Sequence, residues 1–227
     1  MNRRAFLATG TSVGIGLTAG CLTDVIAGEE IPEEMILEPP EDEHGGNDDL
    51  AYPTYGETFP TIELPDPLAE TTVDTSTFDD EAIVCTGFYA TCPSECIPLM
   101  NNVAAVQYES IDSGFEDDVR FLAITFDPEQ DTPAELDEHA DMVGVDRDAG
   151  NWHYLRPADA DEARSVVNDE LGIMFDRDGE GPAADFTHIV VTFLVNPDGY
   201  VERSYRGEHL DVDRVSSDLE TVVDEAN

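Results

Sequence analysis

Two cysteines, Cys92 and Cys96, lie close together in the stretch FYATCPSECIPLM, residues 88–100. Three residues separate them, and the chain has only four cysteines in all. In helical geometry, side chains at positions i and i+4 bring their Cβ atoms to about 5–6 Å, from where a modest adjustment permits a disulfide. The same geometry lets two thiolates share one soft metal ion. The spacing alone is therefore compatible with a disulfide, a redox couple or a metal site.

The residues on either side of the pair predict where its helix begins. The short apolar run AIVCTGFYA, residues 82–90, is typical of a buried strand. Pro98 is tolerated in the first turn of a helix but not in its interior. We therefore expect a helix that begins between Glu95 and Ile97, with Cys92 in the preceding loop and Cys96 at the helix N-terminus. The unpaired N–H groups and the helix dipole at that end favour a thiolate.

A third ligand would distinguish a metal site from a redox couple, because two thiolates and one imidazole suit copper and can also hold Zn²⁺. The chain has five histidines. We expect His44 and His139 to be solvated, His153 to pack or hydrogen-bond, and His209 to precede the last helix. His188 opens an apolar strand after a loop, and ligands gather at such strand ends in α/β sheets. On position alone, His188 is either a metal ligand or a structural histidine.

Apolar runs and helical patterns alternate along the chain, which predicts an α/β fold with helices on both faces of a sheet. Residues 119–126 form a second apolar run, and helical patterns cover residues 99–111, 132–144, 159–172 and 211–227. The helix at 132–144 has Thr132 as its cap, Pro133 in its first position and Gly144 at its end. The apolar run at 188–195, the turn NPDG and residues 200–207 predict a hairpin.

Four stretches of this chain, in their order and spacing, resemble the Sco/SenC family of copper proteins of cytochrome oxidase assembly. They are GFYATCPSEC, ITFDPEQDTPAELDEHA, NWHYL and THIVVTFLVNPDG, within residues 57–227. The resemblance implies a thioredoxin-like fold with a central mixed sheet, and one copper ion held by Cys92, Cys96 and His188. The chain departs from the family at Ile97, which separates Cys96 from Pro98, and at Cys85, which we expect in the core. For the DPEQDTP segment we expect turn and capping roles.

The resemblance also implies a function: a membrane-tethered chaperone that delivers copper to the binuclear copper site of a terminal oxidase. Its partners would be the copper-site subunit of that oxidase and a thiol reductant, because a disulfide between Cys92 and Cys96 removes both thiolate ligands. The alternative is an enzyme, a thiol–disulfide oxidoreductase in which the same pair keeps the acceptor's cysteines reduced. Thioredoxin-like folds support both activities.

The composition is strongly acidic, with 52 Asp and Glu against 10 cations and a formal net charge of −42. All ten cations are arginine. Such a surface repels itself at low salt, whereas at about 1 M salt the Debye length is only about 3 Å. The composition therefore resembles that of proteins from extreme halophiles, especially haloarchaea. It excludes nucleic acid as a partner, because no basic patch exists to neutralise phosphate.

The N-terminal residues read as an export signal followed by a tether. Arg3 and Arg4 form a twin-arginine pair before an apolar run, and LTAGC resembles a lipobox that ends in Cys21. We expect a signal peptide at 1–20, a lipid on Cys21, an acidic disordered tether at 21–56 and the folded domain at 57–227. The alternative is an uncleaved membrane anchor. Either arrangement places the domain on the extracytoplasmic face of the cell membrane.

Overall fold

The structure is a computed structural model that describes residues 31–40, 50–78, 80–92, 96–179 and 185–226. The predicted signal peptide, Cys21 and part of the predicted tether lie outside these residues. No helix among the described residues has the length and hydrophobicity needed to cross a membrane.

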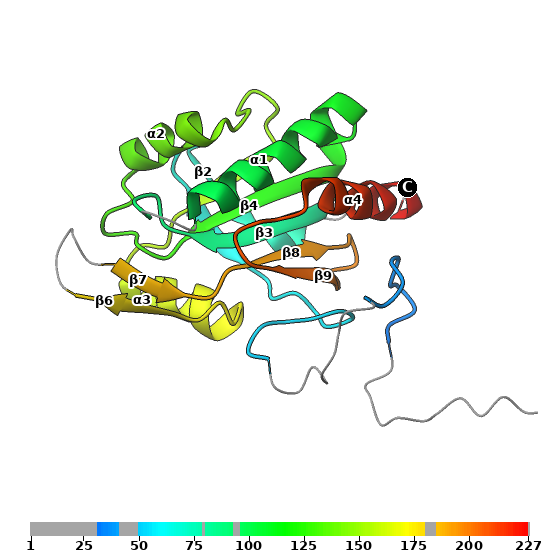
Figure 1. Cartoon of the computed structure of the whole chain (residues 1–227), viewed down its shortest axis with the longest axis horizontal. Coiled ribbons are helices and arrows are strands. Elements are labelled where there is room, and N and C mark those ends of the chain that lie inside the picture. The colour runs from blue at the N-terminus through cyan, green and yellow to red at the C-terminus, as the bar shows by residue number, and fades with distance from the viewer. Residues whose placement is uncertain (1–30, 41–49, 79, 93–95, 180–184, 227) are drawn as a thin grey trace, which may run out of the picture. The chain divides into compact units, whose positions relative to one another are not determined.

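A five-stranded mixed sheet forms the centre of the fold (Figure 1). Its strand order is β5-β4-β3-β8-β9, and the strands are β3 (Ala82–Phe88), β4 (Val119–Thr125), β5 (Trp152–Leu155), β8 (Val191–Val195) and β9 (Val201–Arg206). β4 runs parallel to β3 and β5, whereas β8 runs antiparallel to β3 and β9. Every residue of β3 and β8 is buried, because both faces of the sheet are covered.

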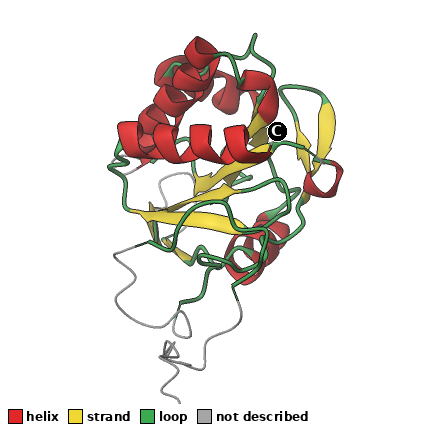
Figure 2. Ribbon diagram, turned by 90° about the vertical axis from the view of Figure 1, so that its right-hand side faces the viewer, coloured by secondary structure: helices red, strands yellow, loops and turns green. Residues whose placement is uncertain are grey.

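Helices cover both faces of this sheet (Figures 1 and 2). In the view of Figure 1, α1 (Cys96–Ser113), α2 (Pro133–Val143) and α4 (Val212–Ala226) lie above it. Below it lies α3 (Ala160–Ala163), which continues as a π-helical stretch, η4 (Arg164–Glu170). The predicted α/β class, with a central mixed sheet and helices on both faces, is confirmed.

Local sequence signals set the ends of α2 as predicted. The Thr132 hydroxyl accepts a hydrogen bond from the N–H of Glu135 at 3.3 Å, Pro133 is the first helical residue, and Gly144 ends the helix with φ 79°. A positive φ favours glycine because it carries no Cβ.

Two antiparallel hairpins lie outside the central sheet. One consists of β1 (Glu63–Asp66) and β2 (Thr71–Asp74), and the other of β6 (Phe175–Asp178) and β7 (Asp185–His188). Two short 3₁₀ helices complete the elements: η2 (Thr75–Thr77) and η3 (Glu116–Asp118). The β6–β7 hairpin pairs Phe175 with His188, so this small hairpin carries the predicted histidine ligand.

Residues 31–40 and 50–56, which belong to the predicted tether, contact the folded domain. Leu37 and Tyr52 are buried, and the N–H of Gly56 donates to the carbonyl of Val201 in β9 at 2.9 Å. Gly172 accommodates this segment, because a Cβ there would lie 1.9 Å from the carbonyl oxygen of Ala51. The folded contacts therefore extend N-terminally of residue 57, which the acidic composition of this stretch did not indicate.

Candidate metal site

The two cysteines lie where the central strand β3 meets α1. α1 begins at Cys96, within the predicted range, and Pro98 occupies its first turn. The N–H of Cys92 donates to the carbonyl of Tyr89 at 3.2 Å, and the N–H of Cys96 donates to the Cys92 sulfur at 3.3 Å. Both side chains are buried. A backbone donor aimed at the Cys92 sulfur from a helix N-terminus stabilises the thiolate form.

His188 is the last residue of β7, and its two ring nitrogens have different surroundings. Nδ1 lies 3.2 Å from the carbonyl oxygen of Ile189. A carbonyl can only accept, so Nδ1 carries the ring hydrogen and donates to it. Nε2 then presents its lone pair, and it lies 3.9 Å from the Cys96 sulfur. The backbone therefore holds the ring in the tautomer that makes Nε2 a ligand atom.

The sulfurs of Cys92 and Cys96 and a ring nitrogen of His188 lie within 4.8 Å of one another. Metal–sulfur and metal–nitrogen bonds of about 2.3 and 2.0 Å place donor atoms on one ion up to about 4–4.5 Å apart. A closing movement of a few tenths of an ångström therefore fits all three atoms around a single ion. In the described part of the chain, this is the one group of three or more such side chains that could hold a metal ion.

An aromatic cluster surrounds the His188 imidazole and consists of Tyr89, Phe126, Phe175 and Phe186. The imidazole centroid lies 5.2 Å from that of Phe126 and 6.0 Å from that of Tyr89. Within the cluster, Phe126 stacks on Phe175 at 4.9 Å, and Phe186 packs on Tyr89 at 4.9 Å. The aromatic cluster lowers the local dielectric constant and restricts the access of water. Both effects strengthen the interaction of thiolates with a cation.

The aromatic cluster is tied to the domain by one arginine on the hairpin. Arg177 of β6 forms an ion pair with Glu129 at 2.8 Å, and Glu129 lies in the segment between β4 and α2. The Arg177 guanidinium also lies over the Phe186 ring, 5.8 Å from its centroid. The pair therefore connects the histidine-bearing hairpin to the main sheet from the solvent side.

Asp131, in the DPEQDTP segment, supports the cysteine loop. Its carboxylate accepts hydrogen bonds from the Thr125 hydroxyl and from the N–H of Ala90 at 3.0 Å. Burial raises the pKa of the Asp131 carboxyl to about 7. The capping role predicted for Thr132 is confirmed, whereas the role of Asp131 was not predicted. An aspartate between an apolar strand and a helix cap was the available signal.

The prediction that His139 is solvated is wrong. His139 is 3% exposed, its Nδ1 lies 3.0 Å from the Tyr154 hydroxyl, and its ring lies 5.0 Å from that of Phe88. Its acidic neighbours Asp137 and Glu138 occupy the exposed side of α2, so the local charge misled the prediction. Burial lowers the pKa of His139 to about 4.

None of the other described histidines joins the cysteines. His153 hydrogen-bonds Asp66 at 3.0 Å, as expected, and His209 is exposed. His44 and the predicted lipidation residue Cys21 lie outside the described residues. Cys85 is fully buried in β3, as predicted for a core residue, and burial raises the pKa of its thiol.

Comparison with known proteins agrees with this fold. A family model described as SCO1/SenC matches residues 66–224. Copper-bound ScoI of Arabidopsis thaliana is similar in structure, with a TM-score of 0.60 and 19% identity over 74% of this chain and 99% of that chain. A SCO1/SenC family lipoprotein of Bacillus anthracis matches with a TM-score of 0.61 and 17% identity over 73% of this chain and 94% of that chain.

A third similar structure is that of BsSco, a member of the Sco family of cytochrome c oxidase assembly proteins in which a disulfide switch was identified. It matches with a TM-score of 0.59 and 19% identity over 75% of this chain and 95% of that chain. These likenesses confirm the predicted thioredoxin-like fold. No curated protein matches the chain.

Proposed function

Because the chain belongs to the SCO1/SenC family, as its motifs predicted, we propose that it binds one copper ion at Cys92, Cys96 and His188 and delivers it to the binuclear copper site of a terminal oxidase. The observation that carries the proposal is the convergence of the two sulfurs and the imidazole nitrogen within 4.8 Å. Copper-bound structures of the similar proteins from Arabidopsis thaliana and Bradyrhizobium japonicum support copper as the metal.

The donor set suits a soft cargo ion. Two thiolates supply negative charge and polarisable sulfur, which favour Cu(I), and a neutral imidazole completes a set that also accepts Cu(II). Cys92 and Cys96 sit on a short loop and a helix end, so both sulfurs face the same point. Delivery proceeds by ligand exchange: cysteines of the acceptor replace these ligands one at a time, so the ion never enters bulk water.

The oxidation state of the cysteine pair controls whether the chain can bind its cargo. Forming a Cys92–Cys96 disulfide removes two protons and two electrons and leaves His188 without its two thiolate partners. An extracytoplasmic location favours that disulfide. A thiol reductant that returns both electrons is therefore a required partner. The disulfide switch identified in BsSco supports such a role for the pair.

A second function, thiol–disulfide exchange, is favoured by the 3.3 Å contact between the Cys96 N–H and the Cys92 sulfur. A thiolate stabilised in this way can attack a disulfide of the acceptor; the chain is then oxidised to its own disulfide while the acceptor gains two thiols. His188 distinguishes the functions, because exchange needs only the two cysteines whereas copper binding uses all three residues.

The sequence supports a location for this chemistry. The twin-arginine pair, the lipobox ending in Cys21 and the acidic, lysine-free composition support export of a folded, haloarchaeal-type lipoprotein. The domain then works on the extracytoplasmic face of the cell membrane, near the copper-site subunit of the oxidase. The description of the similar Bacillus anthracis protein as a lipoprotein supports the same arrangement.

Copper stoichiometry tests the proposal. The reduced protein, held in about 1 M salt so that its charges are screened, is titrated with Cu(I) against a competing chelator, alongside a His188→Ala variant. We expect one tightly bound copper per chain and a clear loss of affinity in the variant. If the variant binds copper as well as the parent does, or if neither binds it, the copper site is wrong and the cysteine pair remains as a redox couple.

A further inference from the structure

Residues 31–40, called the strap below, dock on the buried side chain of Glu202 in β9. Glu202 is 0% exposed. Its carboxylate accepts hydrogen bonds from the N–H groups of Ile36 at 2.8 Å and Leu37 at 3.0 Å, and from the side-chain amide of Asn196 at 2.7 Å. A buried carboxylate is costly unless its oxygens are paired, so the strap backbone supplies donors that the domain itself needs.

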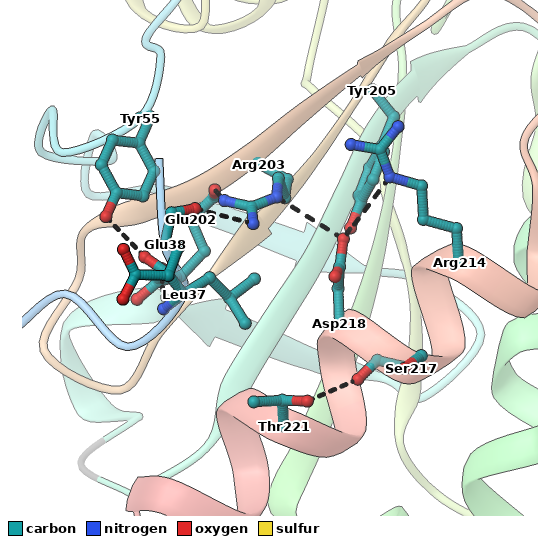
Figure 3. Close-up of polar contacts among 10 residues, drawn as sticks. All are labelled: Leu37, Glu38, Tyr55, Glu202, Arg203, Tyr205, Arg214, Ser217, Asp218 and Thr221. Carbon is teal, nitrogen blue, oxygen red and sulfur yellow. Dashed lines mark hydrogen bonds and ion pairs between the residues drawn. The ribbon is translucent and has the colours of Figure 1, made fainter. Parts of the chain in front are cut away.

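Three further contacts hold the strap on the same end of the domain. The Asn196 amide also donates to the carbonyl of Glu34 at 3.1 Å. The Tyr55 hydroxyl donates to the carbonyl of Leu37 at 2.5 Å, and Arg203 donates to the carbonyl of Glu38 at 3.0 Å (Figure 3). Because these bonds go to the strap backbone, its acidic side chains remain in solvent while its main chain is fixed.

The strap and the metal site lie at opposite ends of the central sheet. Strand β3 leads into the cysteine loop at Phe88, and its other end, at Ile83, pairs with Val195 of β8. Asn196 follows Val195 directly, so the strap contacts lie at the end of β3 remote from the cysteines. Seven residues of β3 at about 3.3 Å each separate the two ends by about 20 Å.

Docking of the strap changes how many residues separate Cys21 from the first described contact with the domain. Nine residues, 22–30, separate Cys21 from the strap, and they span at most about 30–33 Å when fully extended. Without the docked strap, the next described contacts with the domain begin near residue 50. The 28 residues from 22 to 49 span up to about 100 Å when fully extended. The strap therefore shortens the greatest reach of the tether about threefold.

We propose that the strap fixes the membrane tether to the end of the sheet opposite the metal site, and so limits how far the site can reach from the membrane. The inference rests on the proposed lipid anchor at Cys21. It constrains the partner: the acceptor must present its copper site within about 50 Å of the membrane, which is the span of residues 22–30 together with the length of β3. The buried Glu202 is the positioning residue, since it holds the strap through Ile36 and Leu37.

Trp152, the only tryptophan of the chain, reports on this arrangement. It begins β5 and pairs with Phe121 of β4. Phe121 pairs in turn with Val84 of β3, which pairs with Leu194 of β8, one residue before Val195. Trp152 therefore lies at the strap end of the sheet. In vesicles that contain a dansyl-labelled phospholipid, energy transfer from Trp152 to the dansyl group falls as that end moves away from the membrane.

The experiment compares the full-length lipidated protein with three variants in molar salt. Glu202→Ala removes the acceptor, Leu37→Pro removes one strap donor without touching β9, and Glu208→Ala removes an equal charge without touching the strap. We expect strap amides to exchange with deuterium at least tenfold faster, and energy transfer to fall, in the first two variants only. Cu(I) stoichiometry and affinity should stay unchanged in all of them.

The outcomes separate this inference from the proposed function. The proposed role of the strap is overturned if the deuterium exchange of the strap amides, or the energy transfer, is unchanged in both Glu202→Ala and Leu37→Pro. If the wild-type chain does not float with the vesicles, the lipid anchor is absent and the proposed limit on reach is overturned. Copper binding by His188→Ala tests the copper site separately. A failure of the strap and a failure of the copper site can therefore be told apart.

Discussion

Cys92 and Cys96 lie where β3 meets α1, whereas His188 lies on a hairpin whose strands, among the described residues, pair only with each other. The cysteine half is built on a fully buried strand that is paired on both sides, by β4 and β8. Two residues after His188, the carbonyl of Val190 accepts a hydrogen bond from the N–H of Gly207 at 3.0 Å, next to the end of β9. The hairpin itself packs on the domain through the aromatic cluster and the Arg177–Glu129 ion pair.

For the proposed copper site, this difference indicates how an ion can be bound and still released. Main-chain ladders are lost only when the domain unfolds, whereas a hairpin held by side chains opens at a lower free energy. In the proposed delivery of copper, the two thiolates thus form the permanent half of the site, and the imidazole forms the half that withdraws. The variants below are ordered by their expected effect on copper affinity.

Replacing a cysteine should have the largest effect, because it removes charge from the permanent half. Losing a residue that only hydrogen-bonds a metal ligand typically costs about 10–100-fold in metal affinity. We expect Cys96→Ser to weaken Cu(I) binding by more than this, because it removes a ligand itself. The fold should persist, since serine differs from cysteine only by an oxygen atom in place of the larger sulfur. Chelator competition measures the affinity, and circular dichroism checks the fold. Binding close to that of the parent would mean that Cys96 is not a ligand.

Phe126→Ala should break the histidine half. Phe126 is buried and packs on Phe175 and on the His188 ring. The cavity should cost about 3–5 kcal/mol of unfolding free energy, and copper affinity should fall roughly tenfold as the hairpin loosens. Phe121→Ala is the matched control, because Phe121 is equally buried and stacks on Trp152 at the other end of the sheet.

Denaturant unfolding and copper titration of both phenylalanine variants separate the two effects. Both should lose similar stability, but only Phe126→Ala should lose copper affinity. Equal losses of affinity would show that general destabilisation, and not the position of His188, controls binding. The comparison between the two halves of the site would then fail.

The half that the sequence predicted best is the half that depends on local signals. The apolar run of β3 and Pro98 together predicted the strand, the loop and the start of α1, because such preferences act over a few residues. The approach of His188 to Cys96 joins residues that are 92 positions apart. From position alone it stayed ambiguous, and only the family resemblance selected His188.

The features that the sequence did not predict are those in which tertiary packing overrides local composition. His139 has acidic neighbours in the chain but is buried against Phe88 and Tyr154. The strap is acidic, yet its backbone docks on Glu202. Neither a charge count nor periodicity reports where main-chain N–H groups find their acceptors, so these contacts need the three-dimensional structure.

Breaking the ion pair of the histidine half should have a smaller effect. Arg177→Gln removes the pair with Glu129 and the guanidinium over Phe186. Both groups are partly exposed, so we expect a loss of about 0.5–1 kcal/mol and a two- to fivefold loss of copper affinity that shrinks as salt rises. Arg120→Gln is the control, because Arg120 pairs with Glu81 at the start of β3, away from the site. A similar loss in both variants would remove any special role for Arg177.

The smallest effect on copper affinity is expected from Asp131→Asn, which tests the support of the cysteine half. Burial raises the pKa of Asp131 to about 7, so between its ordinary pKa and pH 7 the folded chain binds more protons than the unfolded chain. Its contribution to the unfolding free energy therefore falls as pH rises through this range. His139, whose pKa burial lowers to about 4, contributes the opposite slope up to its ordinary pKa near 6.5.

Asparagine keeps an acceptor for Ala90 and Thr125 but cannot ionise, so the variant should keep its copper affinity and change only its pH dependence. Denaturant unfolding at a series of pH values should show stability that rises from pH 4 to 6.5, once the opposing contribution of Asp131 is removed. An unchanged pH profile would contradict the raised pKa. A loss of copper affinity would show that the cysteine half depends on this one carboxylate, and that its main-chain ladders do not fix the sulfurs by themselves.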